Sequence, residues 1–380
     1  MKHLEAEVII VGGGPAGLST ALHLVQQDPA WAGRVLVLEK AHYPRAKLCG
    51  GGITRPGLDV LSGLDLPLAV PHAPINRVRL RYGSQNYFLE GSPAFAIVHR
   101  PEFDAWLAQE AQAHGITIHQ GADVQQVQVT DALVQVRTRG RTYHAQALVA
   151  ADGSNSVVRR QLHWGNGHKA RLLEVFTPAT AQQEALFDWT PLDSGVQGYV
   201  WAFPGLVEGQ PAMNRGIYDA NFRARAQKPQ LKAVLAQCLA REGLSLGDYE
   251  LKGHPIHWWT PAQPLARPRV LLAGDAAGVD PLLGEGIAFA LGYGQVAAQA
   301  LVAAHQARDY TFADYTQRVR QHWLTKQLRA RHLGARLAFG TMRWPPLTRA
   351  LWAASPWLFR VLAAYRPEYF PLDKKRMLRA

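Results

Sequence analysis

The stretch Ala6–Gln27, AEVIIVGGGPAGLSTALHLVQQ, decides the fold. Its apolar run predicts a buried strand, its glycines predict a turn, and the apolar periodicity after them predicts a helix. Gly12, Gly14 and Gly17 fit the spacing GxGxxG, in which glycine allows a tight turn, close approach of the backbone to a pyrophosphate and close packing of the helix. The stretch therefore predicts the first half of a dinucleotide-binding unit.

The next apolar run completes this unit. RVLVLEK, residues 34–40, predicts a second buried strand, and Glu39 stands at its end, 22 residues after Gly17. At that position a carboxylate can accept hydrogen bonds from a ribose, while the N-terminus of the preceding helix faces the phosphates with free N–H groups. The two strands, the glycine turn and the acid together favour a dinucleotide cofactor over a purely structural turn.

Composition and cysteine content describe an ordinary globular protein. The chain has 380 residues, 48% of them hydrophobic and 18% charged, which suits two or three folded domains. It starts almost directly in a strand, without an export signal, so we expect a cytoplasmic protein. Two cysteines, Cys49 and Cys238, indicate no disulfide framework, and the histidine spacings fit no metal-ligand set, so we assign no metal.

The excess positive charge lies in the C-terminal part of the chain. The net charge is +12, and residues 318–380 hold fourteen Lys or Arg against two acids, whereas the rest is balanced. A basic segment rich in aromatic residues suits an anionic membrane surface, so peripheral association with the inner face of the membrane is one expectation. Packing of these helices on the protein's own body is the alternative. No nucleic-acid-binding module is present, so we expect no nucleic acid partner. The aromatic residues are Trp344, Trp352, Trp357, Phe359, Tyr365 and Phe370.

Three later motifs select the cofactor. HRPEFDAWL (99–107), AADGSNSVVR (150–159) and LLAGDAAGVDPLLGEGI (271–287) follow the glycine turn in the order found in FAD-dependent aromatic hydroxylase-like proteins, which the chain resembles from end to end. The resemblance implies that Arg100 contacts FAD and that Asp275 bonds its ribityl chain. It also implies that Asp152 and Gly153 support the cofactor.

The glycines of the last motif have a physical role of their own. Gly284 and Gly286 precede a predicted helix, whose N-terminal N–H groups can point toward the flavin pyrimidine ring. Such groups stabilise the negative charge of reduced flavin. The motif therefore favours storage of a hydride on the cofactor.

Within this superfamily the chain most resembles the geranylgeranyl reductase family. PRAKLCGGGIT (44–54) and GYVWAFP (198–204) are similar to that family's Pro-Arg-x-Lys-x-Cys-Gly-Gly and Tyr-x-Trp-x-Phe-Pro elements, and PLLGEGI (281–287) is also reductase-like. The resemblance implies an FAD-dependent reductase that saturates carbon–carbon double bonds of an isoprenoid chain. The electron donor stays open among NADPH, NADH and ferredoxin.

Two other functions are open at this stage. A hydroxylating flavin monooxygenase of the same fold would prefer Ala-His where Ala277 and Gly278 stand. From a different class comes a flavin-bound isoprenoid-binding protein without turnover. Three outcomes distinguish these functions. Reoxidation of the reduced flavin by an alkene indicates a reductase, and an oxygen-dependent product indicates a monooxygenase. Tight binding with neither result indicates a binding protein.

Alkene chemistry suggests the catalytic residues. An isolated alkene accepts hydride only if a proton reaches the other carbon, which builds positive charge on the more substituted carbon. Aromatic faces stabilise such charge, so we expect Tyr199 and Trp201 to line the reacting position, unless they are ordinary core residues of a strand. Cys49 is either a proton relay or a small side chain packed near the flavin. Arg45 and Lys47 either hold phosphate or lie in solvent.

We therefore predict a mixed α/β and α+β fold. Residues 1–75, 96–165 and 265–305 form a Rossmann-like FAD-binding domain, residues 76–95 and 166–264 form an inserted substrate-binding β-sheet domain, and residues 306–380 form a helical, basic C-terminal region. The predicted cofactor-binding residues are Gly12, Gly14, Ala16, Gly17, Glu39, Lys40, Arg45, Cys49, Gly50, Gly51, Arg100, Val124, Asp152, Gly153, Gly274, Asp275, Gly284, Gly286 and Ile287.

Overall fold

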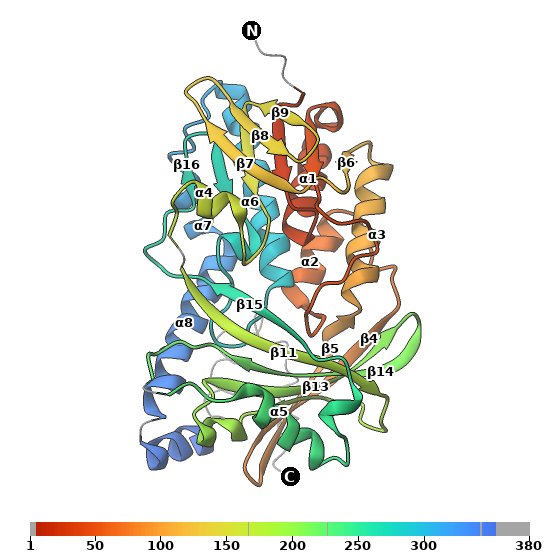
Figure 1. Ribbon diagram of the computed structural model, residues 1–380, viewed down its shortest axis with the longest axis vertical. Helices are drawn as coiled ribbons and strands as arrows, with labels where there is room; N and C mark the ends of the chain where they lie inside the picture. The colour runs from red at the N-terminus through yellow and green to blue at the C-terminus, as the bar shows by residue number, and fades with distance from the viewer. Residues whose placement is uncertain (1–4, 166, 226, 343, 355–380) are drawn as a thin grey trace.

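The computed structural model describes residues 5–165, 167–225, 227–342 and 344–354. Its two large sheets lie one beyond the other along the longest axis of the molecule (Figure 1). Of the predicted aromatic tail, Trp357, Phe359, Tyr365 and Phe370 lie outside the described residues.

The first sheet is built from the short apolar runs. Strands β1, β2, β6, β10 and β17 pair in parallel in the order β17-β10-β1-β2-β6, and β16 adds an antiparallel edge next to β17. The continuous burial of β1, β2, β10 and β17 is typical of parallel strands covered on both faces, whereas the edge strand β6 is partly exposed. The bounds are β1 Val8–Val11, β2 Val35–Leu38, β6 Thr117–His119, β10 Ala147–Ala150, β16 Ala266–Arg267 and β17 Val270–Leu272.

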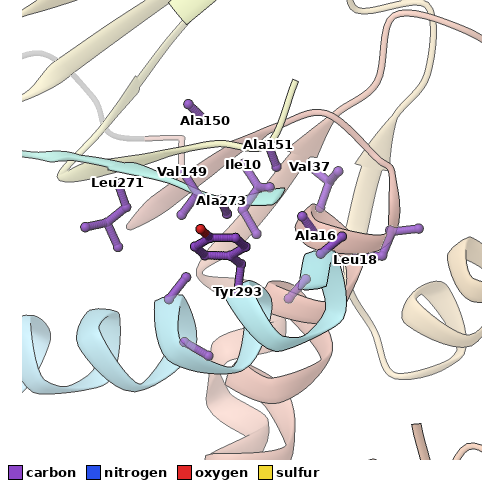
Figure 2. Packing of buried hydrophobic residues seen from close by; sticks show 14 of the residues in the cluster. Ile10, Ala16, Leu18, Val37, Val149, Ala150, Ala151, Leu271, Ala273 and Tyr293 are labelled. Carbon is purple, nitrogen blue, oxygen red and sulfur yellow. The ribbon is translucent and has the colours of Figure 1, made fainter. Parts of the chain in front are cut away.

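Helices α1 (Pro15–Gln27) and α6 (Ile287–Ala307) pack against each other beside this sheet. Figure 2 shows the Tyr293 ring of α6 lying among Ile10, Val149 and Ala273 of the strand region. Its hydroxyl donates a hydrogen bond of 3.1 Å to the carbonyl of Gly278, so the buried phenol is satisfied. A three-stranded sheet, β7 (Val124–Val129), β8 (Val134–Thr138) and β9 (Thr142–Ala145), contributes to the same core.

Helix α6 is long and apolar enough to cross a membrane, the one such helix among the described residues. However, 78% of its most apolar window is buried inside the protein. The helices beside it are α1, α2 (Arg55–Gly63), α7 (Tyr315–Gln321) and α8 (Trp323–Thr341). The helix is therefore explained as a core element, whose small residues allow close approach to α1.

The second sheet has the order β15-β11-β14-β13-β12-β4-β5-β3. Its register pairs Tyr199 with Tyr218 and Trp201 with Gly216, so these residues share one face. The alternate residue Val200 belongs to the other face, which packs on α5 (Leu231–Ala240). The bounds are β3 Gly52–Thr54, β4 His72–Tyr82, β5 Gln85–Val98, β11 His168–Pro178, β12 Ala185–Asp188, β13 Gly198–Val207, β14 Gln210–Asp219 and β15 Lys252–Trp258.

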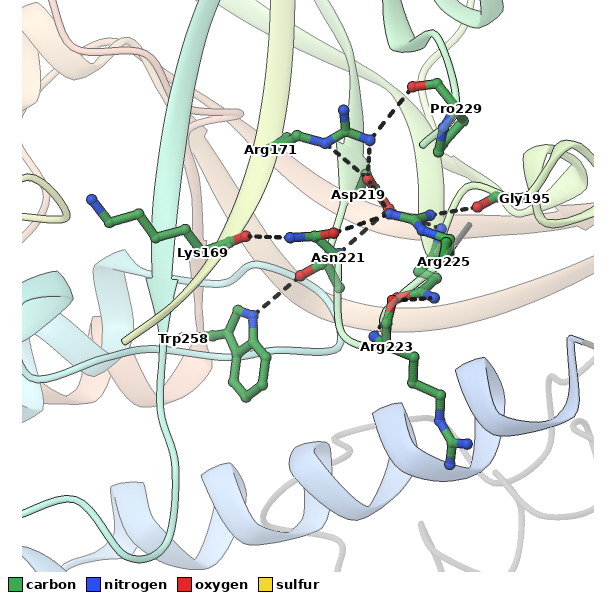
Figure 3. A network of polar contacts seen from close by, with 11 residues as sticks. Lys169, Arg171, Gly195, Asp219, Asn221, Arg223, Arg225, Pro229 and Trp258 are labelled. Carbon is green, nitrogen blue, oxygen red and sulfur yellow. Dashed lines mark hydrogen bonds and ion pairs between the residues drawn. The ribbon is translucent and has the colours of Figure 1, made fainter. Parts of the chain in front are cut away.

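A buried carboxylate fixes the end of β14. Asp219 accepts hydrogen bonds from Arg171 (2.6 Å) and Arg225 (2.9 Å), and from the backbone N–H of Gln197 (3.0 Å), as Figure 3 shows in part. Burial by itself raises the pKa of Asp219, but the two arginines outweigh this effect and leave the pKa below its ordinary value. The network ties β11, β14 and the chain before β13 together.

The remaining helices connect these layers. Helix α3 ends before Gly115, whose φ of +82° suits a glycine that terminates a helix. Helices α7 and α8 form the described start of the basic region, together with a helical segment at 345–354. The bounds are α2 Arg55–Gly63, α3 Arg100–Ala113, α4 Val157–Gln161, α7 Tyr315–Gln321 and α8 Trp323–Thr341, with short 3-10 turns at Pro29–Gly33, Thr190–Ser194, Leu246–Asp248 and Gly274–Ala276.

The predicted mixed fold with a Rossmann-like sheet is confirmed by this architecture. The division into domains stays a prediction. Strands β4 and β5 of the second sheet extend over 72–98, beyond the predicted segment 76–95.

Candidate active site

A cavity of about 1220 Å³ runs from the glycine turn after β1 to the aromatic face of the second sheet. Its walls come from the segment 45–52, the loops 151–155 and 282–287, strands β13 and β14, and helix α8. The catalytic candidates Cys49, Tyr199 and Trp201 all line it. So do all the predicted cofactor-binding residues except Gly17 and Gly274.

Close contacts within the protein require glycine at three of the predicted positions. Gly12 has φ of +106°, and a Cβ there would lie 2.3 Å from the carbonyl oxygen of Ala151. A Cβ at Gly17 would lie 2.0 Å from the Gly12 oxygen, so this glycine serves the packing of α1 on β1. Gly274 likewise serves packing, because its Cβ would lie 2.7 Å from the side chain of Ala16.

Glu39 is buried at the end of β2, as the motif requires. Its carboxylate accepts hydrogen bonds from the backbone N–H of Gly13 (2.9 Å) and of Ala41 (3.0 Å). Arg45 lies 3.3 Å from Glu39 and 3.1 Å from Asp104. Because Arg45 is shared by two carboxylates, it is less available to an anion than the sequence suggested, and its contact with the cofactor stays a prediction.

The other basic residues of this region differ in their partners. Arg100 forms a bidentate pair with Asp104 (2.8 and 2.9 Å) and also lies beside Cys49. Lys47 lines the cavity without such a partner among the described residues, and burial lowers its pKa although Asp275 acts in the opposite direction. Burial thus favours the neutral amine, and a phosphate or other anion bound beside Lys47 would favour its charged form again.

Two predicted acids occupy the cavity wall with different roles. Asp152 caps α4 by accepting hydrogen bonds from Val157 N–H (2.7 Å) and Val158 N–H (3.2 Å). Its other oxygen is buried without a partner among the described residues, and burial raises its pKa. Asp275 accepts a hydrogen bond from Ser154 (2.9 Å).

These features fit FAD. The bare glycine turn suits a pyrophosphate, the unpartnered oxygen of Asp152 can accept a hydrogen bond from a cofactor hydroxyl, and α6 begins at Ile287 directly after Gly286, with its N–H groups at the cavity wall. Val124 and Lys40 complete the wall near Glu39.

The catalytic candidates are held by hydrogen bonds at their far ends. Tyr199 donates its hydroxyl proton to the carbonyl of Leu283, and Trp201 Nε1 donates to Asn214 Oδ1 at 2.7 Å. The Trp201 ring lies over Gly216, where a Cβ would be 2.2 Å from the indole. Cys49 Sγ lies 3.4 Å from the Gly51 nitrogen and accepts its N–H.

Sequence reasoning missed several residues of this site. Asn214 lies on the strand that follows GYVWAFP across the tight turn at Glu208 and Gly209, and this hairpin signal could have placed it beside Trp201. Arg331 of α8 could not have been found in this way, because the pattern of an amphipathic helix does not show which residues the helix will contact. Other wall residues that the sequence did not predict include Phe187, Trp189, Tyr218, His254, Leu282 and Trp352.

Arg331 joins α8 to the loop that faces the cofactor. Its guanidinium lies 2.6 Å from Asp280 and 2.6 Å from Glu285, and Glu285 also accepts a hydrogen bond from Thr54. Among the described residues, no group of three or more His, Cys, Asp or Glu side chains is arranged to hold a metal ion.

A nucleotide-binding parallel sheet with this glycine turn, joined to an apolar chamber, defines a flavoprotein. The family model described as "FAD binding domain" matches residues 5–326, and the chain belongs to that family. It is an FAD-dependent oxidoreductase.

Relatives extend this result. The chain is 29% identical to menaquinone reductase of Mycolicibacterium smegmatis over 346 residues, covering 81% of this chain and 79% of that one. It is 26% identical to geranylgeranyl diphosphate reductase of Synechocystis over 345 residues, covering 83% and 80%. These similarities confirm the resemblance to geranylgeranyl reductases.

Solved structures share the fold. A geranylgeranyl bacteriochlorophyll reductase-like protein of Thermoplasma acidophilum has a TM-score of 0.75 at 22% identity, covering 91% of both chains. The halogenase PltM has a TM-score of 0.71 at 16% identity, covering 94% of this chain and 79% of that one. The fold is therefore shared by proteins of different activity.

Proposed function

We propose that this protein is a reductase that saturates carbon–carbon double bonds of an isoprenoid chain. The observation that carries the proposal is the continuity of the cavity, which joins the FAD site to a chamber lined by Tyr199, Trp201 and Phe203. An apolar chain can lie in such a chamber with its double bond at the flavin. The reductase names of the relatives support the same class of reaction.

When bound and reduced, FAD supplies the hydride for this reaction. The protein must then exclude water and stabilise positive charge on the alkene carbon. The rings of Tyr199 and Trp201 are 5% and 3% exposed and face the cavity, where a desolvated aromatic face stabilises a cation by about 0.5–2 kcal/mol. Burial raises the pKa of Tyr199, so its hydroxyl stays protonated and hydrogen-bonded to Leu283.

Cys49 is the proposed carrier of the proton. Its thiol lies on the cavity wall between the FAD site and the aromatic face, with the Arg100 guanidinium beside it. The segment 49–51 therefore combines a proton-carrying group with glycines that allow close approach to a flavin.

The test is anaerobic reduction of the bound flavin followed by mixing with isoprenoid substrates. Geranylgeranyl diphosphate and a menaquinone are used, with a fully saturated chain as the control. We expect only the unsaturated compounds to reoxidise the flavin, and mass spectrometry to find two added hydrogens per bond. A product that forms only with oxygen and contains an oxygen atom would establish a monooxygenase instead. Tight binding without reoxidation would establish a carrier.

We also propose that the cavity mouth meets an anionic membrane surface. Among the described residues, five of the six exposed large hydrophobic side chains lie between 333 and 351. Leu337 and Leu351 belong both to this surface and to the cavity wall. Lys326, Arg329 and Arg336 are exposed beside them on α8. A basic surface with exposed apolar side chains suits anionic lipids, and a lipid substrate would enter there. The five residues are Leu333, Leu337, Trp344, Leu347 and Leu351.

Co-sedimentation with vesicles tests this membrane contact. We expect the intact protein to bind phosphatidylglycerol vesicles, less at high salt, and Leu337→Asp combined with Leu333→Asp to weaken binding. Phe176→Asp is the matched control, because Phe176 is the sixth exposed residue and lies on β11. Absence of binding by the unmodified protein, or equal loss in the control, would reject the contact.

A further inference from the structure

A buried carboxyl lies next to Trp201 on the face of the second sheet that lines the cavity. In the register, Glu174 of β11 pairs with Gly216 of β14, and Gly216 pairs with Trp201 of β13. Directly paired residues point to the same face, so Glu174 and Trp201 flank the bare glycine on one side of the sheet. Glu174 is 4% exposed, and its Oε2 has no hydrogen-bond partner among the described residues.

Asn214 connects two of the three catalytic candidates, Cys49 and Trp201. Its Oδ1 accepts the hydrogen bond from Trp201 Nε1 at 2.7 Å, and its Nδ2 donates to the backbone oxygen of Cys49 at 3.1 Å. The Asn214 amide and the backbone N–H of Cys49 also act on Glu174, where both favour the ionised form. Asn214 therefore holds the Cys49 backbone and the Trp201 ring, and the Glu174 carboxyl lies close enough to act on both the Asn214 amide and the Cys49 N–H.

The charge of Glu174 changes near neutral pH. Burial raises its pKa to about 7, against the opposing effects of Asn214, Cys49 N–H, Lys252 and Lys47. Lys252 and His254 face it from β15, and Lys47 faces it from the segment before Cys49. His254 is neutral at this pH, because burial and Lys47 lower its pKa to about 4. Of Glu174 and His254, it is therefore Glu174 whose charge changes near neutral pH.

We propose that Glu174 is a positioning residue for Cys49. Through Asn214 and the Cys49 N–H it sets the place of the thiol and of the Trp201 ring in the cavity, and its charge sets the electrostatic potential at the sulfur. The ionised carboxylate attracts the Asn214 amide and the Cys49 N–H, which favours the observed place of this segment, while a proton on the carboxyl removes part of this attraction. The effect on turnover rests on the proposed function, whereas the effect on the thiol does not.

The direct test is alkylation of Cys49 by iodoacetamide in a Cys238→Ser background without substrate. The rate is measured from about pH 6 to about pH 8, the range in which the Glu174 charge changes. Glu174→Gln keeps the shape but cannot ionise, so we expect faster alkylation at the upper pH and loss of the wild-type inflection near neutrality. Glu242→Gln is the matched control, because Glu242 pairs with Arg215 away from the cavity.

Turnover gives the second readout. In Glu174→Gln we expect kcat to fall about ten-fold with KM and FAD content little changed, as for a displaced reacting group. Asn214→Ser should do the same, and it replaces Glu174→Gln as the decisive variant if the latter does not fold. Alkylation profiles that coincide for the wild type, Glu174→Gln and Asn214→Ser would overturn the proposal. An altered profile without alkene reduction by the wild type would support the positioning role while rejecting the reductase.

Discussion

Tyr199 combines two contacts in one side chain, a ring on the cavity wall and a hydroxyl on the carbonyl of Leu283. The ring packs 5.0 Å from both Phe187 and Trp189, so its position is fixed from the side as well as from its end. The two contacts can be separated by substitution, because Phe keeps the ring and Leu keeps neither.

We therefore predict different outcomes for two substitutions at this residue. Tyr199→Phe should keep most of the turnover and lose about 1–3 kcal/mol of stability, because the Leu283 carbonyl loses its donor. Tyr199→Leu should lower turnover by about two- to thirty-fold, because ring stabilisation contributes about 0.5–2 kcal/mol beyond packing. Steady-state kinetics, denaturant unfolding and FAD content measure the three effects. Full turnover in the Leu variant would remove Tyr199 from the mechanism.

Residues whose role depends on a local motif were predictable from the sequence. A residue whose role depends on pairing between strands distant in sequence was not. Gly12 follows from a turn of a few residues, and Glu39 follows from the length of one βαβ unit. Asn214 was within reach of the hairpin signal between β13 and β14, whereas Glu174 matters because β11 pairs with β14, a strand distant in sequence. A single sequence predicts where strands lie along the chain, but it does not predict which side chains lie next to each other on paired strands.

At the scale of elements, the loop 280–286 is held from two sides. The sheet holds it through Tyr218, whose hydroxyl donates to the Pro281 carbonyl at 2.9 Å, and through Tyr199. Helix α8 holds it through Arg331 and the carboxylates of Asp280 and Glu285. The loop that precedes α6 is thus placed jointly by the sheet and the basic C-terminal helix.

We predict that Arg331→Leu lowers the free energy of unfolding by about 3–5 kcal/mol, because it leaves the fully buried Asp280 without its cation. Adding Asp280→Asn should recover part of this loss. Arg336→Leu on the exposed side of α8 serves as the control, with little effect expected. Urea unfolding of the wild type, the two single variants and the double variant measures these free energies. Equal stability of Arg331→Leu and Arg336→Leu would show that the ion pair between Arg331 and Asp280 is dispensable.

The sequence predicted β1, α1 and β2 well because their periods are strong, and it predicted that the basic region is helical. It did not predict that α8 forms a wall of the cavity. The surface of α8 carries apolar and basic residues on several sides, so packing on the body and contact with a membrane were both open. The described residues show both an inner contact through Leu328 and an exposed side at Leu333.

At the scale of the whole molecule, three half-buried or buried histidines set the response to acid. Burial is the main cause that lowers the pKa of His254, His257 and His322 to about 4. Between about pH 4 and pH 6.5 these histidines therefore bind protons in the unfolded chain but not in the folded chain. The free energy of unfolding consequently increases with pH in this window. Glu174 acts in the opposite direction, because its raised pKa lets the folded chain bind the extra proton.

Burial also lowers the pKa of His23 and His332, whereas Asp152 and Glu174 are the carboxyls whose pKa burial raises. Histidines with a lowered pKa thus outnumber these carboxyls among the described residues, and we expect a net loss of stability on acidification. We predict a lower urea midpoint at about pH 5 than at about pH 7.5, with His257, only 1% exposed, contributing about 2 kcal/mol. His257→Gln should flatten the dependence, and Glu174→Gln should steepen it. A midpoint that is independent of pH over this range would contradict the prediction.

The bare position at Gly216 has a consequence for redesign of the chamber. A side chain at 216 would meet the Trp201 indole at 2.2 Å and also the backbone carbonyl oxygen of Leu173 at 2.3 Å. Removing the indole would therefore not make room for a larger residue at 216, because the Leu173 backbone stays in place. Shrinking the aromatic residue alone opens a pocket floored by backbone, which could admit a bulkier branch of the chain, so redesign of the chamber has to vary position 201 and keep the glycine.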